Sequence, residues 1–297
     1  MINTIEDGNM DRRLIEIFLK YFDEQAKVEL YHYTTISALY NILKNREFWW
    51  GNTSTMNDKT ELVDFINQLD SAVQVEIKDG AQKQRYYTLF DELKCRIRGE
   101  YPYAMSLSNR YDDAAQWERY ADGAKGVCIT FDTQKLCEAF CPHFFVFSRV
   151  YYDYDITKHE HYSIILDYLE TGRINGFASI DGLVGNIIST AHSYKHRSFM
   201  SENEYRITSL GDTDPMLYKN ISSEVAFELI SGQIKRVLKI RYDVLCEKSS
   251  IDYQDLFKRI TVGPRSEQSL YDLSIFCKQF GFEKLSHNIV TSECPLR

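Results

Sequence analysis

The sequence has 297 residues, enough for one large domain or two small ones, and its 44% hydrophobic content is ordinary for a globular protein. Its 35 basic and 43 acidic residues give a net charge of −8. That charge disfavours general binding to a phosphate backbone, because such binding needs a basic surface. No apolar stretch approaches the ~20 residues that span a bilayer. The first residues also lack the basic and apolar regions of a signal peptide. We therefore expect a cytoplasmic protein with no membrane partner.

The seven cysteines are irregularly spaced, and Cys137 and Cys141 form the only close pair, with His143 just after them. A structural zinc site needs four ligands, and no convincing second pair exists. The cysteines are therefore expected to be reduced and mostly buried thiols, and no metal is predicted.

The first half of the chain alternates helical and strand patterns. Apolar residues at helical spacing predict a helix over about 10–26, and β-forming residues predict a strand over 28–33. Thr35 can cap a helix over 36–44. The remaining expectations in this half are a strand over 47–51, helical structure over about 57–98, a strand over 101–108, a helix over 112–121 and a strand over 126–132.

The second half is expected to be richer in strands. Strands are predicted over 144–152, 204–209, 224–230, 234–240 and 259–262, with helical structure over about 157–197, interrupted around 172–182, and a C-terminal helix over about 266–280.

These patterns predict a single α+β domain over 1–297 rather than a doubly wound parallel sheet, because regular helices do not separate the strands. We divide it into an N-terminal helix (1–27), an α+β core (28–265) with helical segments at about 57–98 and 157–197, and a C-terminal helix and tail (266–297).

The first polar segment with functional potential is the predicted strand around His32. Strand alternation places His32 and Thr34 on one face, and Tyr31 and Tyr33 on the other. A His beside a Thr at a strand end can place two hydrogen-bonding groups in a cleft. A hydrogen-bonded core histidine explains the same spacing.

A second polar segment carries Ser106 and Ser108 on one face of its predicted strand. Two small hydroxyls would let a flat ring approach the sheet closely. A polar strand end before a loop is the alternative.

The third segment combines a basic stretch, from Lys195 to Arg197, with Glu202, Glu204 and Arg206, which alternation directs to one side. Close like charges raise one carboxyl pKa, whereas a neighbouring Arg lowers it. Such a set can orient a hydroxyl or stabilise positive charge on a sugar. A solvated edge strand is the alternative.

An ordered series of motifs carries a family resemblance. The motifs are LYHYT (30–34), FWWGN (48–52), MND (56–58), SLS (106–108), QWERYA (116–121), KGVCITFD (125–132), ENEYRI (202–207) and TVGPR (261–265). Together they resemble a widespread bacterial family catalogued as domain of unknown function 2971. Members usually have Trp where Tyr205 stands and often Phe where Met56 stands. The family also occurs in anti-phage and toxin-like settings, which the resemblance extends to this chain.

That family in turn resembles the ADP-ribosyltransferase superfamily. The resemblance implies a central, mostly antiparallel, split β-sheet flanked by helices, with a helical insertion, and NAD as substrate. Catalytic roles would fall to Glu204, Glu202 and His32. Contacts to NAD would come from His32, Tyr33, Thr34, Trp50 (or Tyr40), Ser106, Ser108, Lys195, Arg197 and Arg206.

The implied reaction transfers ADP-ribose from NAD to a macromolecular acceptor, either protein or nucleic acid, and a partner protein from a defence or toxin system is a further expectation. Two alternatives remain open. One is hydrolysis of NAD by a glycohydrolase. The other is a non-catalytic sensor or partner-binding module that retains the fold.

Overall fold

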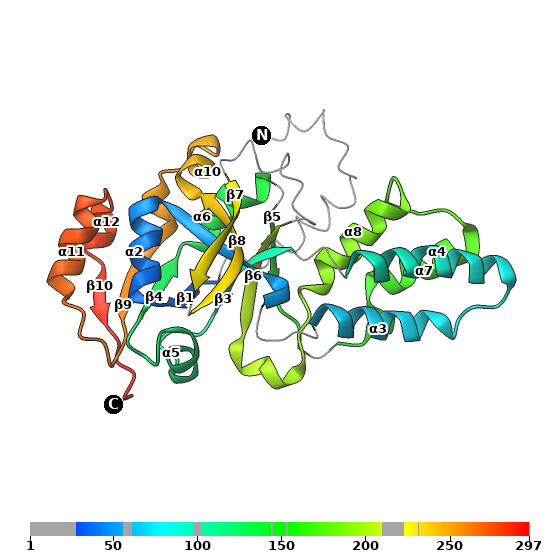
Figure 1. Ribbon diagram of the computed structural model, residues 1–297, viewed down its shortest axis with the longest axis horizontal. Coiled ribbons are helices and arrows are strands. Elements are labelled where there is room, and N and C mark those ends of the chain that lie inside the picture. The colour runs from blue at the N-terminus through cyan, green and yellow to red at the C-terminus, as the bar shows by residue number, and fades with distance from the viewer. Residues whose placement is uncertain are drawn as a thin grey trace.

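The computed structural model describes residues 28–55, 61–97, 102–143, 145–152, 154–209, 223–230 and 232–296. The helix predicted over 10–26 lies outside these residues. A large sheet with its covering helices occupies one end of the elongated molecule, and a group of helices forms the other end (Figure 1).

Ten strands form one sheet. They are β1 (Leu30–Thr34), β2 (Glu47–Asn52), β3 (Tyr103–Ser108), β4 (Val127–Phe131), β5 (Phe145–Arg149), β6 (Glu204–Ser209), β7 (Ser223–Ile230), β8 (Gln233–Arg241), β9 (Phe257–Val262) and β10 (Ile289–Thr291). Among these strands β10 runs parallel to β9, and the other pairs are antiparallel. The predicted α+β class with a mostly antiparallel sheet is confirmed.

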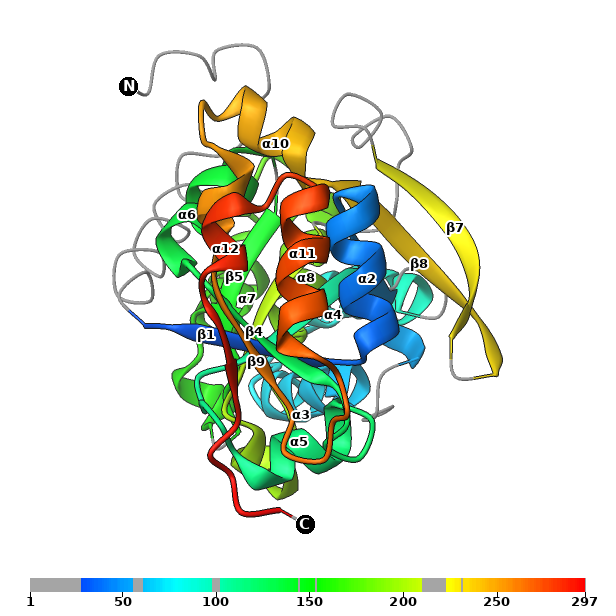
Figure 2. The same ribbon diagram turned by 90° about the vertical axis from the view of Figure 1, so that its left-hand side faces the viewer.

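The sheet divides at β3. One edge of β3 pairs with β6 along its length, from Ala104 to Ser108. Two strands share its other edge: β2 pairs with Tyr103 and Ala104, whereas β1 pairs only with Ser108. One branch therefore continues as β1-β4-β9-β10 and the other as β2-β8-β7. We call the gap between β1 and β2 the fork. Beyond it, β7 and β8 form a hairpin that extends to one side of the molecule (Figure 2).

The helices are α2 (Ile36–Asn45), α3 (Glu61–Gln74), α4 (Gly80–Arg96), α5 (Ala114–Tyr120), α6 (Thr133–Phe140), α7 (Glu160–Thr171), α8 (Ile180–Ala191), α10 (Tyr242–Lys248), α11 (Leu270–Gln279) and α12 (Glu283–Ser286). Thr35 caps α2 as predicted, by accepting a hydrogen bond from the Ala38 amide. The sequence patterns did not predict α6, α10, α12 or β10. None of the helices in the described ranges is long and apolar enough to cross a bilayer.

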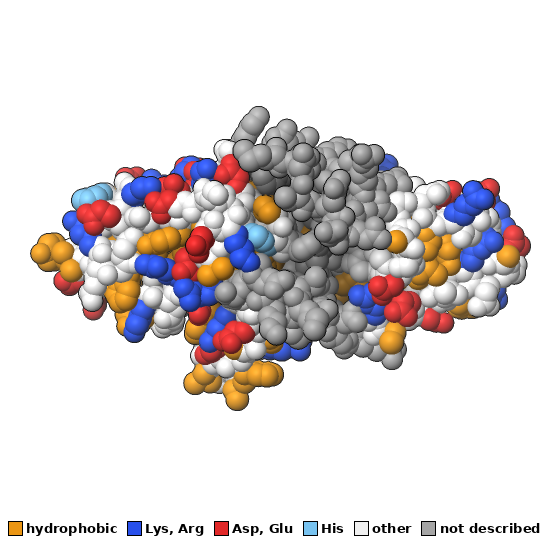
Figure 3. All heavy atoms as spheres, turned by 90° about the horizontal axis from the view of Figure 1, so that it is seen from above, with side chains coloured by type: hydrophobic (Ala, Val, Ile, Leu, Met, Phe, Trp, Pro, Cys, Tyr) orange, Lys and Arg blue, Asp and Glu red, His pale blue; other side chains and the backbone are white. Residues whose placement is uncertain are grey.

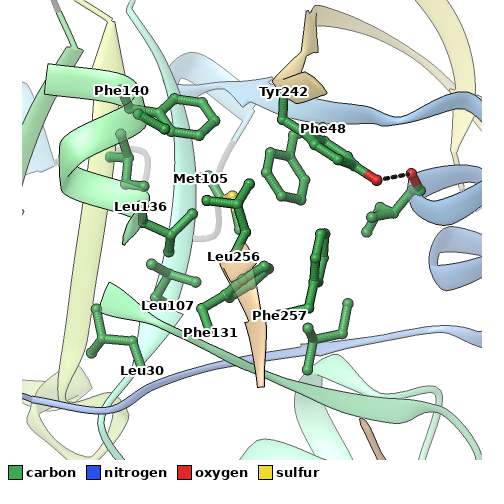
Figure 4. Close-up of a cluster of buried hydrophobic side chains, with 14 of the residues drawn as sticks. Leu30, Phe48, Met105, Leu107, Phe131, Leu136, Phe140, Tyr242, Leu256 and Phe257 are labelled. Atoms are coloured by element: carbon green, nitrogen blue, oxygen red, sulfur yellow. Dashed lines mark hydrogen bonds between the residues drawn. The ribbon is translucent and has the colours of Figure 1, made fainter. Parts of the chain in front are cut away.

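Strand alternation separates an apolar face of the sheet from a polar one. In β3 the side chains of Met105 and Leu107 enter the main core, whereas Ser106 and Ser108 point to the opposite face. Helices α2, α6, α10, α11 and α12 cover the apolar face. Aromatic rings fill much of this core, among them Phe48, which lies against Tyr242 and Phe131 (Figure 4).

The helical segments at about 57–98 and 157–197 are each two helices. They come from separate points in the chain, α3 and α4 between β2 and β3, and α7 and α8 between β5 and β6. The four helices pack on one another around an apolar cluster of their own, which includes Phe65, Leu89, Ile165 and Ile187. This helical unit lies beside β5 and β6 (Figure 1).

Helix α5 packs on part of the polar face, where Trp117 meets Tyr33 edge-on with ring centroids 4.9 Å apart. It packs on β1 and β4, and its residues Gln116 and Tyr120 border a cavity that opens on the polar face at the fork. Over the described residues on the face shown in Figure 3, acidic and basic side chains are interspersed rather than separated by sign.

The aromatic core predicts a large cost for truncating Phe48, which is 2% exposed. Phe48→Ala should lower the free energy of unfolding by about 3–5 kcal/mol, because it leaves a cavity among rings that cannot fully collapse. Urea denaturation monitored by circular dichroism measures this. The control is Tyr271→Ala, at a site 74% exposed, which should change stability by no more than about 0.5 kcal/mol. Equal effects of the two substitutions would contradict the described core.

Candidate functional site

A cavity of about 320 Å³ opens on the polar face at the fork. Side chains from β1, β2, β3, β6 and β8 line it, together with α5 and the segment before β6. Its volume is at the lower end of the range for small-molecule sites. Of the residues predicted from the sequence, the cavity brings together His32, Tyr33, Ser106, Ser108, Lys195, Glu202, Glu204 and Arg206.

His32 lies in the fork itself. Its Nδ1 is 3.0 Å from the carbonyl oxygen of Ser106, at a point where neither β1 nor β2 pairs with β3. Only a protonated Nδ1 can donate to a carbonyl, so the ring takes the place of the missing strand hydrogen bond. Burial lowers the pKa of His32, and the bond to Ser106 only partly offsets this. The neutral ring therefore keeps Nε2 as a hydrogen-bond acceptor.

Glu204 is the most strongly held carboxylate of the site. The guanidinium group of Arg206 binds the Glu204 carboxylate in a bidentate manner, with Nε 2.7 Å from Oε1 and a terminal nitrogen 3.0 Å from Oε2. Lys195 Nζ lies 3.1 Å from Oε2. Burial alone would raise the carboxyl pKa, but the charges of Arg206 and Lys195 outweigh it and lower the pKa to about 2. Glu204 is thus a fixed anion on the cavity wall.

Glu202 is linked to Glu204 through Lys195, although alternation along a strand does not explain their proximity. Glu202 ends a short 3-10 helix, Arg197–Glu202, and Asn203 turns the chain with a left-handed φ of 47° before β6 begins. Lys195 Nζ is 2.7 Å from Glu202 Oε2, and the Tyr120 hydroxyl donates to Oε1 at 2.6 Å. Two adjacent carboxylates are therefore held together by one buried ammonium group.

The two serines have different surroundings. Ser106 makes a side-chain hydrogen bond that helps to lower the pKa of Glu204. The hydroxyl of Ser108 donates to the backbone carbonyl of Glu202 at 2.8 Å and accepts from the Arg110 amide at 3.2 Å. Ser108 therefore anchors the segment that carries Glu202, whereas Ser106 contacts Glu204.

The structure places the other predicted residues away from the cavity. Trp50 is fully buried in the apolar core, where it stacks on Phe140, because alternation in β2 points it away from the polar face. Thr34 is buried at the end of β1, and Arg197 is exposed at the start of the 3-10 helix. Tyr40, the alternative stacking ring, packs on Phe276. Tyr33 borders the cavity, but its hydroxyl donates to the Arg110 carbonyl at 2.7 Å.

Sequence reasoning missed Trp49, Gly51, Tyr120 and Lys235, which also line the cavity. Trp49 and Gly51 alternate with Trp50 along β2, so a correct choice of the buried tryptophan would have revealed them. No local pattern identified Lys235, because the approach of β8 to the fork is a long-range feature of the sheet.

The comparison with family models gives one result for this chain. Residues 116–207 match the family described as Protein of unknown function (DUF2971). The matched segment includes Tyr120, Lys195, Glu202, Glu204 and Arg206, and it confirms the resemblance to that family. No curated protein and no solved structure matches the chain. The fainter resemblance to ADP-ribosyltransferases stays a prediction.

The low pKa of Glu204 predicts an acid-dependent loss of stability. Its value is about 2 in the folded chain against an ordinary 4.5, so the stabilisation is complete above pH 4.5 and is lost as the pH falls towards 2. It should amount to on the order of 3 kcal/mol. Denaturant titrations across this range should show a shallower pH dependence for Glu204→Gln than for the unsubstituted protein. Glu118→Gln, at an exposed carboxylate paired with Arg265, should leave the dependence unchanged. Equal slopes for all three proteins would exclude an ionised Glu204 pair.

Proposed function

We propose that the chain cleaves the bond between nicotinamide and ribose in NAD at the fork cavity and transfers ADP-ribose to a macromolecular acceptor. The observation that supports this most is the convergence of His32, Ser106, Glu202 and Glu204 on one cavity from three separate parts of the sequence. The resemblance to ADP-ribosyltransferases implies functional roles for the same four residues.

The proposed step breaks the C1′–N bond, and nicotinamide leaves with the bonding electrons. The ribose then carries positive charge, as in glycoside cleavage. A fixed anion within hydrogen-bonding reach of a ribose hydroxyl stabilises that charge, and Glu204 would have this role. The nucleophile of the acceptor attacks C1′, and its proton passes to a base. Glu202 and the unprotonated Nε2 of His32 are the two candidates.

The charge of the cavity suits an anionic substrate. Its lining contains the cations Lys195, Arg206 and Lys235 and the carboxylates of Glu202 and Glu204. With His32 neutral, this leaves one net positive charge, in a protein whose overall charge is −8. The two phosphates of NAD would be attracted to such a cavity. NAD is an intracellular compound, which agrees with the expected cytoplasmic location. The acceptor, a defence or toxin setting and a partner protein rest on the resemblance alone.

One observation favours a second candidate, a non-catalytic binding module. Both oxygens of Glu204 already accept from Arg206, and Lys195 neutralises the pair of carboxylates further. Compensation of this kind weakens the field that Glu204 exerts on a ribose cation. A site retained for binding would tolerate such compensation better than a catalytic one.

Incubation with NAD labelled in its adenylate phosphate separates the candidates. With cell extract present, transfer should give labelled macromolecule. Hydrolysis, the third candidate, gives free labelled ADP-ribose instead. Binding without loss of NAD, measured by equilibrium dialysis, would favour the non-catalytic module. Neither binding nor turnover by the folded protein would exclude NAD as the ligand.

Substitutions then assign the activity to the cavity. Glu204→Gln should reduce turnover roughly 10²–10³-fold, because it removes the anion that stabilises the transition state. Glu202→Gln should reduce transfer more than hydrolysis if Glu202 activates the acceptor. The control is Glu118→Gln, a neighbouring carboxylate outside the cavity, which should retain full turnover. Retention of activity by Glu204→Gln would place the reaction elsewhere.

A further inference from the structure

The branch formed by β2 and β8 makes a cavity wall for which neither the family nor the predicted residues supply a role. Gly51 lies in this wall, paired with Val237 of β8 on one side and Ala104 of β3 on the other. A Cβ atom added at Gly51 would have no described atom within 4 Å. Because the strand has no side chain here, the backbone forms a flat floor with open space above it.

An aromatic ring borders this floor. Trp49 is two residues before Gly51, so both face the cavity. Neighbours hold the indole in place: its N–H donates to Glu47 at 3.2 Å, and the Lys239 ammonium lies 4.8 Å from the ring centroid. Trp49 is also the one tryptophan of three that is partly exposed, since Trp50 and Trp117 are fully buried.

A cation stands at the same wall. Lys235 is partly exposed and lines the cavity. Glu228 lies opposite it in the hairpin but pairs with Lys239 at 2.6 Å. Within the described ranges Lys235 forms no ion pair, whereas the other lining cations, Lys195 and Arg206, are bound to carboxylates. Among the cations that line the cavity, Lys235 can therefore bind a ligand anion without breaking an ion pair of the described residues.

We propose that this wall binds a 5′-nucleotide, with its planar heteroaromatic ring over Gly51 beside Trp49 and its phosphate at Lys235. An aromatic side chain next to a flat stretch of backbone favours stacking of any base, and an ammonium group adds a charge-assisted bond to phosphate. That the nucleotide is the nicotinamide half or the adenine half of NAD rests on the proposed function. The existence of a binding site for an aromatic ring (the ring site) does not depend on the proposed function.

Intrinsic tryptophan fluorescence tests the ring site, because Trp49 dominates any response to ligand or to acrylamide. Titration with nicotinamide mononucleotide or AMP should change the emission and protect it from acrylamide quenching, and the nucleotide that binds more tightly identifies the half of NAD. Ribose 5-phosphate and inorganic phosphate, which lack a heteroaromatic ring, should give little protection. In Trp49→Phe the nucleotide-dependent change should disappear. Protection by neither nucleotide, or equal protection by ribose 5-phosphate, would overturn the proposal.

Gly51→Val tests the floor without depending on fluorescence. Valine suits a strand, and its side chain enters open space, so the fold should be retained while the ring site is filled. Equilibrium dialysis should show at least tenfold weaker nucleotide binding. The matched control is Gly80→Val, at another open glycine in the helical unit, which should bind normally. Lys235→Gln should weaken binding of the nucleotide but not of the free base.

The results separate this inference from the proposed function. Nucleotide binding that is lost in Gly51→Val, without turnover of NAD, would support the ring site and exclude the enzyme. Turnover of NAD with unchanged nucleotide binding in Gly51→Val would support the enzyme and overturn the ring site.

Discussion

The arrangement of the molecule depends on the pairing of β3. Because β6 occupies one edge of this strand, β1 and β2 must share the other edge. β2 pairs at the beginning of this edge and β1 at its end, so the backbone between them has no strand partner. A buried carbonyl without a hydrogen bond is costly. The Nδ1–H of His32 supplies that bond at Ser106, and the divergence of the two branches creates the cavity. The histidine that supplies this structural bond therefore also lines the cavity.

A buried network of charged side chains from β6 and the segment before it also lines the cavity. Arg206 is fully buried and joins Glu204 to the backbone of His192 at the end of α8, with one terminal nitrogen 2.7 Å from the His192 carbonyl oxygen. The imidazole Nε2 of His192 lies 3.0 Å from the Thr53 hydroxyl just after β2. Removal of one partner from such a network is expensive, because it leaves the other charge buried without compensation. Ion pairs and hydrogen bonds therefore connect the cavity to the end of α8 in the helical unit.

Local patterns in the sequence predicted most of the elements, since alternation, helical spacing and caps act over a few residues. Thr35 caps its helix through its side-chain oxygen, as the sequence suggested. The polar face of β6 could also be predicted locally, because Glu204 and Arg206 alternate with Tyr205 and Ile207. Trp49 and Trp50 were a different case. Adjacent large rings give no local sign of which faces the core, and the pairing of β2 with β8 decides it.

Roles within the site were harder to predict than positions. Lys195 was predicted to contact NAD, but its ammonium group is bound between the carboxylates of Glu202 and Glu204. Distances between side chains far apart in sequence depend on the whole fold, and only the structure supplies them. His32 and Glu204, to which the resemblance gave roles, both line the cavity, and their roles in a reaction stay predictions.

The two insertions that build the helical unit have a consequence for assembly of the protein. α3 and α4 leave the sheet after β2, whereas α7 and α8 leave it after β5, about a hundred residues later. The His192 ring at the end of α8 reaches the Thr53 hydroxyl, 139 residues away in the sequence, only when these distant segments have met. Closing such long loops is slow, so contacts of this kind form late in folding. A nascent or partly folded chain would therefore contain an incomplete cavity wall, and competence to bind would arrive with the last tertiary contacts.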